Sequence, residues 1–133
     1  MKVMLDTNII ISAVLFPNGR AAQAFLKSLS YPYEPIVCDY VLDELRRKFE
    51  EKFPDKANNL EDFLQTALLF IKVVPTPEAE FREEKKIRDP KDRPILRAAL
   101  NNHADLFLTG DKDFLESSVP DPRIISVAEF LSM

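Results

Sequence analysis

The sequence has few of the residues on which several kinds of chemistry depend. Its 133 residues include no tryptophan, one cysteine and one histidine. Cys38 cannot form an internal disulfide, and it lies in an apolar run where cysteine is typically a small buried hydrophobe. A single histidine, His103, leaves no basis for serine-histidine or cysteine-histidine catalysis or for a histidine-rich zinc site. We expect His103 to cap the end of the helix before Ala104.

Glycine and long apolar runs are also scarce. The two glycines, Gly19 and Gly110, do not lie in a glycine-rich phosphate loop, which excludes dinucleotide-binding and P-loop folds. No apolar stretch is long enough to cross a bilayer, and no secretory signal pattern follows Met1. We therefore expect a cytoplasmic protein without membrane contact.

Positive charge is in the minority. The chain carries 18 Lys and Arg against 22 Asp and Glu, a formal charge of -4, which argues against a nonspecific polybasic binder of nucleic acid. Local basic patches remain at Arg46-Arg47-Lys48 and at 85–88. An acidic cluster that holds a cation adds negative charge without excluding an anionic substrate, because the bound ion inverts the local field.

The remaining composition, 46% hydrophobic and 30% charged, is that of one globular domain spanning residues 1–133. Strand and helix patterns alternate along it, which predicts right-handed crossovers around a parallel sheet with helices on both faces. The fold class is therefore α/β, a three-layer α/β/α sandwich with a central parallel sheet. The predicted strands are 1–6, 36–38, 72–74, 105–109 and 123–125. The predicted helices are 9–16, 20–30, 60–71 and 127–131, together with a helix that contains Leu42, Leu45 and Phe49, a helix from Asp92 to Leu100, and a short helix after Asp111. The helical stripe Ala22, Phe25, Leu26 and Leu29 is interpreted as core rather than as a dimer face.

Two of the hydrophobic runs end in acidic motifs. Val3-Met4-Leu5 leads to Asp6, and Leu106-Phe107-Leu108 leads through Thr109-Gly110 to Asp111. Such runs are typical of buried strands that deliver a carboxylate to the rim of a parallel sheet, where Glu44 and Asp92, on helical stretches, could join them. The competing interpretation is that each acid is only a helix cap or turn residue.

A carboxylate cluster without histidine or thiolate suits Mg²⁺ or Mn²⁺. Such an ion can bind a phosphate oxygen, lower the pKa of a water and stabilise charge on a phosphoryl transition state. A haloacid dehalogenase-like phosphatase is disfavoured because Asp6-Thr7-Asn8 lacks the second acid two residues on. A response regulator is disfavoured because no acidic pair precedes a phosphoacceptor strand.

Together these motifs resemble the PIN domain family, and within it the VapC-like toxins of bacterial and archaeal toxin-antitoxin systems. The resemblance spans nearly the whole chain and implies a Mg²⁺- or Mn²⁺-dependent endoribonuclease in which a metal-activated water hydrolyses RNA without a covalent intermediate. Its carriers are Leu5-Asp6-Thr7-Asn8, Asp43-Glu44-Leu45, Asp89-Pro90-Lys91-Asp92 with the apolar helix behind it, and Ala104-Asp105 leading to Thr109-Gly110-Asp111-Lys112-Asp113-Phe114.

The resemblance also assigns roles to residues. It implies that an acidic quartet is catalytic and holds the metal, and that a fifth acid is a further metal ligand: Asp6, Glu44, Asp92, Asp111 and Asp113. Asp113 could instead hydrogen-bond a ligand or cap the short helix that follows. Glu44 is preferred over Asp43 on the motif alone, and Asp89 is also explained as a turn residue. Asn8 and Thr109 would hydrogen-bond a carboxylate or a substrate phosphate.

Partners and substrate contacts follow less directly. The resemblance implies an RNA substrate, a small antitoxin and a homodimer. Arg20, Lys91, Arg93 and Lys112 could reach phosphates near the metal, or could be solvated surface charges. The alternative function is a catalytically weak PIN-fold module that binds RNA or protein. Acidic residues at all four quartet positions favour the enzyme.

Overall fold

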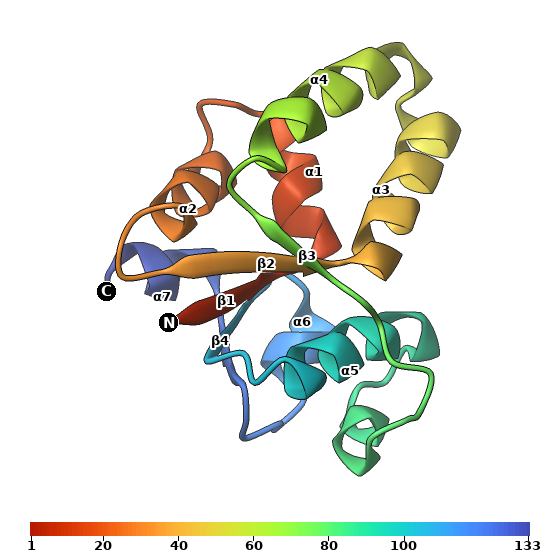
Figure 1. The fold of residues 1–133 in the computed structure, drawn as a ribbon, viewed down its shortest axis with the longest axis vertical. Coiled ribbons are helices and arrows are strands. Elements are labelled where there is room, and N and C mark those ends of the chain that lie inside the picture. Colours follow the sequence, from red (N-terminus) through yellow and green to blue (C-terminus); the bar gives the residue numbers. More distant parts are fainter.

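The computed structural model describes all 133 residues and contains one sheet of five parallel strands. The strand order is β3-β2-β1-β4-β5, so the first strand of the chain lies at the centre (Figure 1). The strands are β1 (Lys2–Leu5), β2 (Glu34–Cys38), β3 (Lys72–Val74), β4 (Leu106–Leu108) and β5 (Arg123–Ile125).

The middle of the sheet is completely covered. Val3, Met4 and Leu5 of β1 are 0% exposed, and Met4 lies opposite Ile36 of β2 and Phe107 of β4. Continuous apolar runs are expected where helices cover both faces of a parallel sheet. Because parallel strands end at one edge, the residues that follow β1, β2 and β4 are brought to the same rim.

Helices cover both faces of the sheet (Figure 1). In chain order, β2 and β3 are added on one side of β1, and β4 and β5 are added on its other side. Right-handed crossovers therefore place the two sets of connecting helices on opposite faces of the sheet. The first set is α1 (Thr7–Leu15), α2 (Arg20–Ser28), α3 (Asp39–Lys52) and α4 (Ala57–Ala67), and the second is α5 (Arg93–Asn101) and α6 (Lys112–Leu115). The last helix, α7 (Val127–Leu131), packs against α2. The predicted α/β/α architecture is confirmed.

Details differ from the sequence prediction in three places. The polar segments contain short 3₁₀ turns: η1 (Pro54–Lys56), η2 (Arg82–Lys86) and η3 (Pro90–Asp92). Helix α4 ends at Ala67, and residues 68–70 turn the chain into β3. On α2, Ala22 and Phe25 are buried as expected, but Leu26 is 60% exposed, so the interpretation of that stripe as core was wrong for Leu26.

The end of α5 agrees with the sequence prediction. His103 follows the C-cap residue of α5 with φ 53°, a left-handed conformation that ends the helix where expected.

No single helix is long and apolar enough to cross a membrane, although α1 and α2, bent by 118°, have that length and composition as a pair.

A buried ion pair fixes the long segment between β3 and α5. Arg97 of α5 donates from Nη2 and Nε to the carboxylate of Glu84, at 2.7 Å and 3.1 Å. Its Nη1 donates to the carbonyl of Pro77 at 3.0 Å, and Glu84 is 1% exposed. This clamp holds the segment that leads to η3 and Asp92.

Candidate metal centre

Asp6 lies at the junction of β1 and α1, and its carboxylate is fixed on both sides. Oδ1 accepts from the backbone N–H of Thr7 at 2.8 Å, which caps α1, and Oδ2 accepts from the hydroxyl of Thr109 at 2.6 Å. The Asp6 backbone N–H donates to Leu108 at the end of β4. With 4% exposure, the side chain is held at the rim of the sheet.

Asp111 follows β4 and begins α6. Its backbone N–H donates to Thr109 Oγ1 at 3.0 Å, and its carboxylate accepts from the backbone N–H of Asp113 at 2.9 Å. Asp111 is therefore the N-cap of α6, and the cap role considered for Asp113 was wrong. Asp113 lies in the first turn, where its carboxylate pairs with Arg88.

Asp92 stands at the N-cap position of α5, yet its side chain makes no capping hydrogen bond. One carboxylate oxygen from each of Asp92, Asp111 and Asp113 lies within 4.8 Å of the other two. Three hard oxygen donors at this spacing are within reach of one shared cation.

Glu44 approaches the rim from the second turn of α3. It is 5% exposed and accepts a short hydrogen bond from the hydroxyl of Thr7, the residue after Asp6. Its other oxygen lies 3.7 Å from the Arg47 guanidinium. Thr7 thus joins α1 to α3 and holds the Glu44 carboxylate beside Asp6.

Burial and mutual repulsion perturb two of these acids. Burial raises the pKa of Asp6 to about 6; hydrogen bonds from Thr109 and Thr7 oppose the rise, and the charges of Asp111 and Glu44 add to it. Burial also raises the pKa of Asp92 to about 7, helped by the charges of Asp6, Asp111, Asp89 and Glu44. Carboxylates that repel one another in this way would be stabilised by a cation among them.

The donor set fits a hard divalent ion. Every candidate ligand is a carboxylate, and the only cysteine, Cys38, is completely buried inside β2. Oxygen-only sites suit Mg²⁺ or Mn²⁺ better than zinc or copper. The residues present therefore fit the metal that the sequence motifs imply.

The two other polar candidates differ in their contacts. Thr109 bonds both Asp6 and the backbone of Asp111. Asn8 contacts neither acid by a hydrogen bond, and its buried Oδ1 has no partner. An unpaired buried acceptor is costly, and because this atom is shielded from solvent, a substrate could reach it only if the side chains around it moved.

The four basic candidates are spread over the surface. Lys91 lines a charged cleft with Glu44 and Asp92. Arg93 donates from Nε to the carbonyl of Ile87 at 2.9 Å, a bond that holds the backbone. Lys112 is exposed next to Asp111. Arg20 is at the start of α2, which follows the C-terminal end of α1, whereas Asp6 lies at the N-terminal end of α1.

Sequence reasoning missed three residues at this rim. They are Thr7, which orients Glu44; Arg88, which pairs with Asp113; and Tyr40, whose hydroxyl donates to the Lys91 carbonyl at 2.5 Å and ties η3 to α3. Thr7 lies inside the first acidic motif, which was a usable signal. The partners of Tyr40 and Arg88 are 51 and 25 positions away, so no local pattern reveals them.

The part of the chain that forms the candidate metal centre matches a known family. A family model described as PIN domain matches residues 2–113, which include all five acids. An uncharacterized protein of Methanocaldococcus jannaschii is 27% identical over 123 residues, 86% of this chain and 74% of that protein.

Two solved structures share the fold. One is VapBC2 of Rickettsia felis bound to a promoter DNA fragment, with a TM-score of 0.72, 16% identity and coverage of 95% of this chain and 98% of that one. The other is DNA-bound VapBC of Salmonella typhimurium, with a TM-score of 0.69, 18% identity and coverage of 96% and 98%.

Proposed function

The chain belongs to the PIN domain family, and from that premise we propose that it is a Mg²⁺- or Mn²⁺-dependent endoribonuclease that hydrolyses RNA phosphodiester bonds. The observation that carries the proposal is the convergence of carboxylates from distant parts of the chain, with oxygens of Asp92, Asp111 and Asp113 within 4.8 Å of one another. The raised pKa values of Asp6 and Asp92 support it, since strongly perturbed groups gather at functional sites.

The side chains divide the work. Asp92, Asp111 and Asp113, whose oxygens lie together, would hold the ion. Asp6, whose charge raises the pKa of Asp92, would be a further ligand, and Glu44, oriented by Thr7, would complete the group of acids. When bound, a divalent ion supplies a Lewis acid that neutralises phosphate charge and lowers the pKa of a water. Thr109 fixes the Asp6 carboxylate, so that the acid keeps its orientation while the phosphodiester bond is hydrolysed.

Direct attack by water is favoured over a covalent intermediate. Two hydroxyls donate to the acids, those of Thr7 and Thr109, which are 2% and 0% exposed. Neither can meet a phosphate without leaving its acceptor. Hydrolysis should therefore leave no phosphorylated protein.

The test is cleavage of a mixed set of labelled RNAs by purified protein with Mg²⁺, with Mn²⁺ and with EDTA. We expect cutting with either metal and none with EDTA. The RNA ends should carry no 2′,3′-cyclic phosphate, because the attacking group is water rather than the neighbouring hydroxyl. Cutting that persists in EDTA, or cyclic ends, would contradict the proposal.

We further propose that the enzyme is the toxin of a cytoplasmic toxin-antitoxin pair and acts as a homodimer. The support is its fold, which is that of chains in the VapBC complexes of two bacteria. The test is co-expression with the product of any small neighbouring open reading frame. A stable complex with suppressed RNA cleavage is expected, and unchanged cleavage would remove the antitoxin from the proposal.

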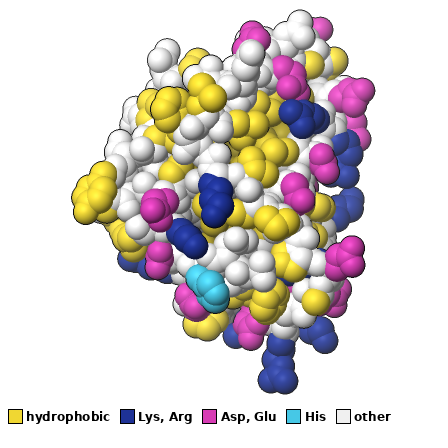
Figure 2. All heavy atoms as spheres, in the orientation of Figure 1, with side chains coloured by type: hydrophobic (Ala, Val, Ile, Leu, Met, Phe, Trp, Pro, Cys, Tyr) yellow, Lys and Arg dark blue, Asp and Glu magenta, His cyan; other side chains and the backbone are white.

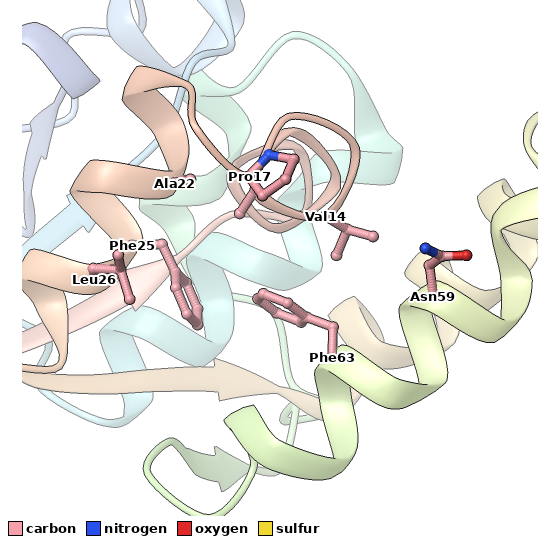
Figure 3. A pocket seen from close by; sticks show the side chains of 8 residues that line it. Val14, Pro17, Ala22, Phe25, Leu26, Asn59 and Phe63 are labelled. Carbon is pink, nitrogen blue, oxygen red and sulfur yellow. The ribbon is translucent and has the colours of Figure 1, made fainter.

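An apolar cavity of about 270 Å³ suits such a partner (Figure 3). Phe25 of α2 and Phe63 of α4 point toward each other and pack together in its wall, with ring centroids 5.1 Å apart. Helix α1 begins beside Asp6 and ends at Leu15, close to Val14 and Pro17 of the cavity wall. An apolar antitoxin segment seated here would need to follow α1 for only about 13 Å to cover the acidic rim.

A second candidate function is a PIN-fold binding module without strong catalysis. The contacts that favour it are the ion pairs of Asp113 with Arg88 and of Glu44 with Arg47, which partly balance the acidic charge without a metal. Titration with Mn²⁺ separates the two functions. Tight binding that Arg88→Ala leaves intact supports the enzyme, and absence of binding supports the module.

A further inference from the structure

We propose that a charged cleft beside the acidic rim binds the phosphates of the RNA strand that adjoin the scissile one. We define the α3–η3 cleft by its lining residues, which are Glu44, Arg47, Lys48, Glu51, Lys52, Asp89, Lys91 and Asp92. The inference rests on the proposed ribonuclease function, and it adds a path for the substrate and the residues that hold it.

The cleft is continuous with the candidate metal centre. Glu44 and Asp92 belong to both, so a strand with its scissile phosphate at the acids can enter the cleft directly. The cavity has a volume of about 380 Å³, room for a few solvated groups rather than for a folded domain. Tyr40 keeps the two walls together, because its hydroxyl bonds the Lys91 carbonyl at 2.5 Å.

One face of α3 supplies most of the lining. Positions 44, 47, 48, 51 and 52 recur at intervals of three and four residues, which places them on one side of a helix. From Glu44 to Lys52 this face runs about 12 Å along the helix axis. Acidic and basic side chains are interspersed along the edge of the molecule formed by α3 (Figure 2).

The charge balance of the cleft changes when the acidic rim is neutralised. Four cationic side chains face four acids in the cleft. A divalent ion at the rim would reduce the negative charge that Glu44 and Asp92 present to the cleft, so that the cations of the cleft would outweigh its acids. Lys48, Lys52 and Lys91 take part in no ion pair of the structure, so their ammonium groups are available to phosphates.

The lining favours a nucleic-acid backbone over a protein segment. None of the eight residues is hydrophobic, so the cleft offers no pocket for the aromatic or aliphatic anchors on which protein interfaces depend. Phosphate contacts need only cations and carry no base information. The cleft is therefore expected to strengthen binding of longer RNA strands without selecting their sequence.

The test compares two double variants that lose the same charge. Lys48→Ala/Lys52→Ala removes two cations of the cleft. Lys72→Ala/Arg123→Ala removes two exposed cations at the amino-terminal ends of β3 and β5. These strand ends lie opposite the carboxyl ends at which the candidate metal centre is found. Thermal unfolding of each variant checks that the fold is unchanged, as expected for exposed or half-exposed positions.

Binding of a labelled single-stranded 12-nucleotide RNA is measured by fluorescence anisotropy at several KCl concentrations, with Ca²⁺ in place of Mg²⁺ so that a hard divalent ion offsets the acids of the rim. Gel electrophoresis of the recovered RNA checks that it stays uncut. For the cleft variant we expect affinity about tenfold lower at low salt and a salt slope about 1.4 smaller, since each lost contact on a single strand contributes about 0.7. The edge variant should match the parent. An equal loss in both variants, no loss in either, or no RNA binding by the parent would overturn the inference.

Cleavage with Mg²⁺ then separates this inference from the proposed function. If the parent cuts RNA and both double variants cut it with the parent's KM, the nuclease stands and the cleft assignment fails. If binding depends on Lys48 and Lys52 but the parent cuts nothing, the cleft stands and the nuclease fails. For a dinucleotide, too short to enter the cleft, cleavage by the cleft variant should equal that by the parent.

Discussion

The hydroxyl of Thr109 lies 2.6 Å from Oδ2 of Asp6 and donates to it across neighbouring strands. Leu108 of β4 is paired with Leu5 of β1, so the next residue of each strand reaches the same point of the rim. The same hydroxyl accepts from the Asp111 backbone at 3.0 Å. One buried threonine therefore positions two acids of the candidate metal centre.

The first prediction concerns this threonine. In Thr109→Val the Asp6 carboxylate loses a donor that lowers its pKa, so the pKa should rise further above about 6. The acidic limb of the pH profile for RNA cleavage should then shift to higher pH. Thr76→Val, which removes an exposed donor to Asp39, is the control and should leave the profile unchanged. An unshifted profile in Thr109→Val would count against the role of Thr109.

The second prediction concerns stability of the metal-free protein. Burial raises the pKa of Asp6 from 3.8 to about 6, so the folded state binds this proton more tightly than the unfolded state. That stabilisation is fully present below about pH 4 and is lost as pH rises through about 6. The resulting decline is on the order of 2 to 3 kcal/mol.

Urea unfolding in EDTA at pH 5 and pH 8 measures this decline. Asp6→Asn removes the titrating group, so its free energy of unfolding should change less between the two pH values than that of the parent. An identical change in both proteins would show that Asp6 titrates normally.

The third prediction is that a divalent ion stabilises the fold in a pH-dependent way. Mn²⁺ should raise the unfolding temperature more at pH 8 than at pH 5.5, because at the lower pH protons occupy Asp6 and Asp92, whose pKa values are about 6 and about 7. Asp92→Asn should abolish the increase, and EDTA should reverse it. Asp43→Asn, at an exposed position next to Glu44, should retain it.

Most of the architecture was predictable because its signals are local. Apolar runs such as Val3-Met4-Leu5 and Leu106-Phe107-Leu108 became fully buried central strands, and their alternation with amphipathic helices implied the parallel sheet. The rule that parallel strands end at one edge then placed Asp6 and Asp111 together. The family resemblance, rather than any spacing, selected Glu44 over Asp43; Glu44 is buried, and Asp43 is exposed.

Long-range pairings could not be predicted in this way. Nothing near Glu84 in the sequence indicates that a buried glutamate meets Arg97 thirteen positions later, and Tyr40 reaches Lys91 across 51 positions. Leu26 was assigned to the core because helical periodicity identifies an apolar stripe without indicating whether a neighbour covers it. These contacts depend on how whole elements pack.

The fourth prediction concerns the clamp between Glu84 and Arg97. Arg97→Met leaves the Glu84 carboxylate buried without its main partner, and breaking such a pair typically costs about 3 to 5 kcal/mol. Urea unfolding at pH 7 measures the loss. Arg46→Met breaks an ion pair with Glu61 whose side chains are about half exposed, and it should cost less than about 1 kcal/mol. Equal losses in the two variants would contradict the structural role of the clamp.

The central claim is that Asp6 and its neighbouring acids form a metal-dependent ribonuclease site. The most direct measurement is the rate of RNA cleavage with Mg²⁺ by the parent, by Asp6→Asn and by Asp62→Asn, whose position on α4 is exposed. Asp6→Asn keeps the shape of the side chain, so all three proteins should fold. We expect Asp62→Asn to match the parent and Asp6→Asn to lose more than about 100-fold, because even residues that only support metal ligands account for about 10- to 100-fold. Cleavage by folded Asp6→Asn at the parent rate would contradict the claim.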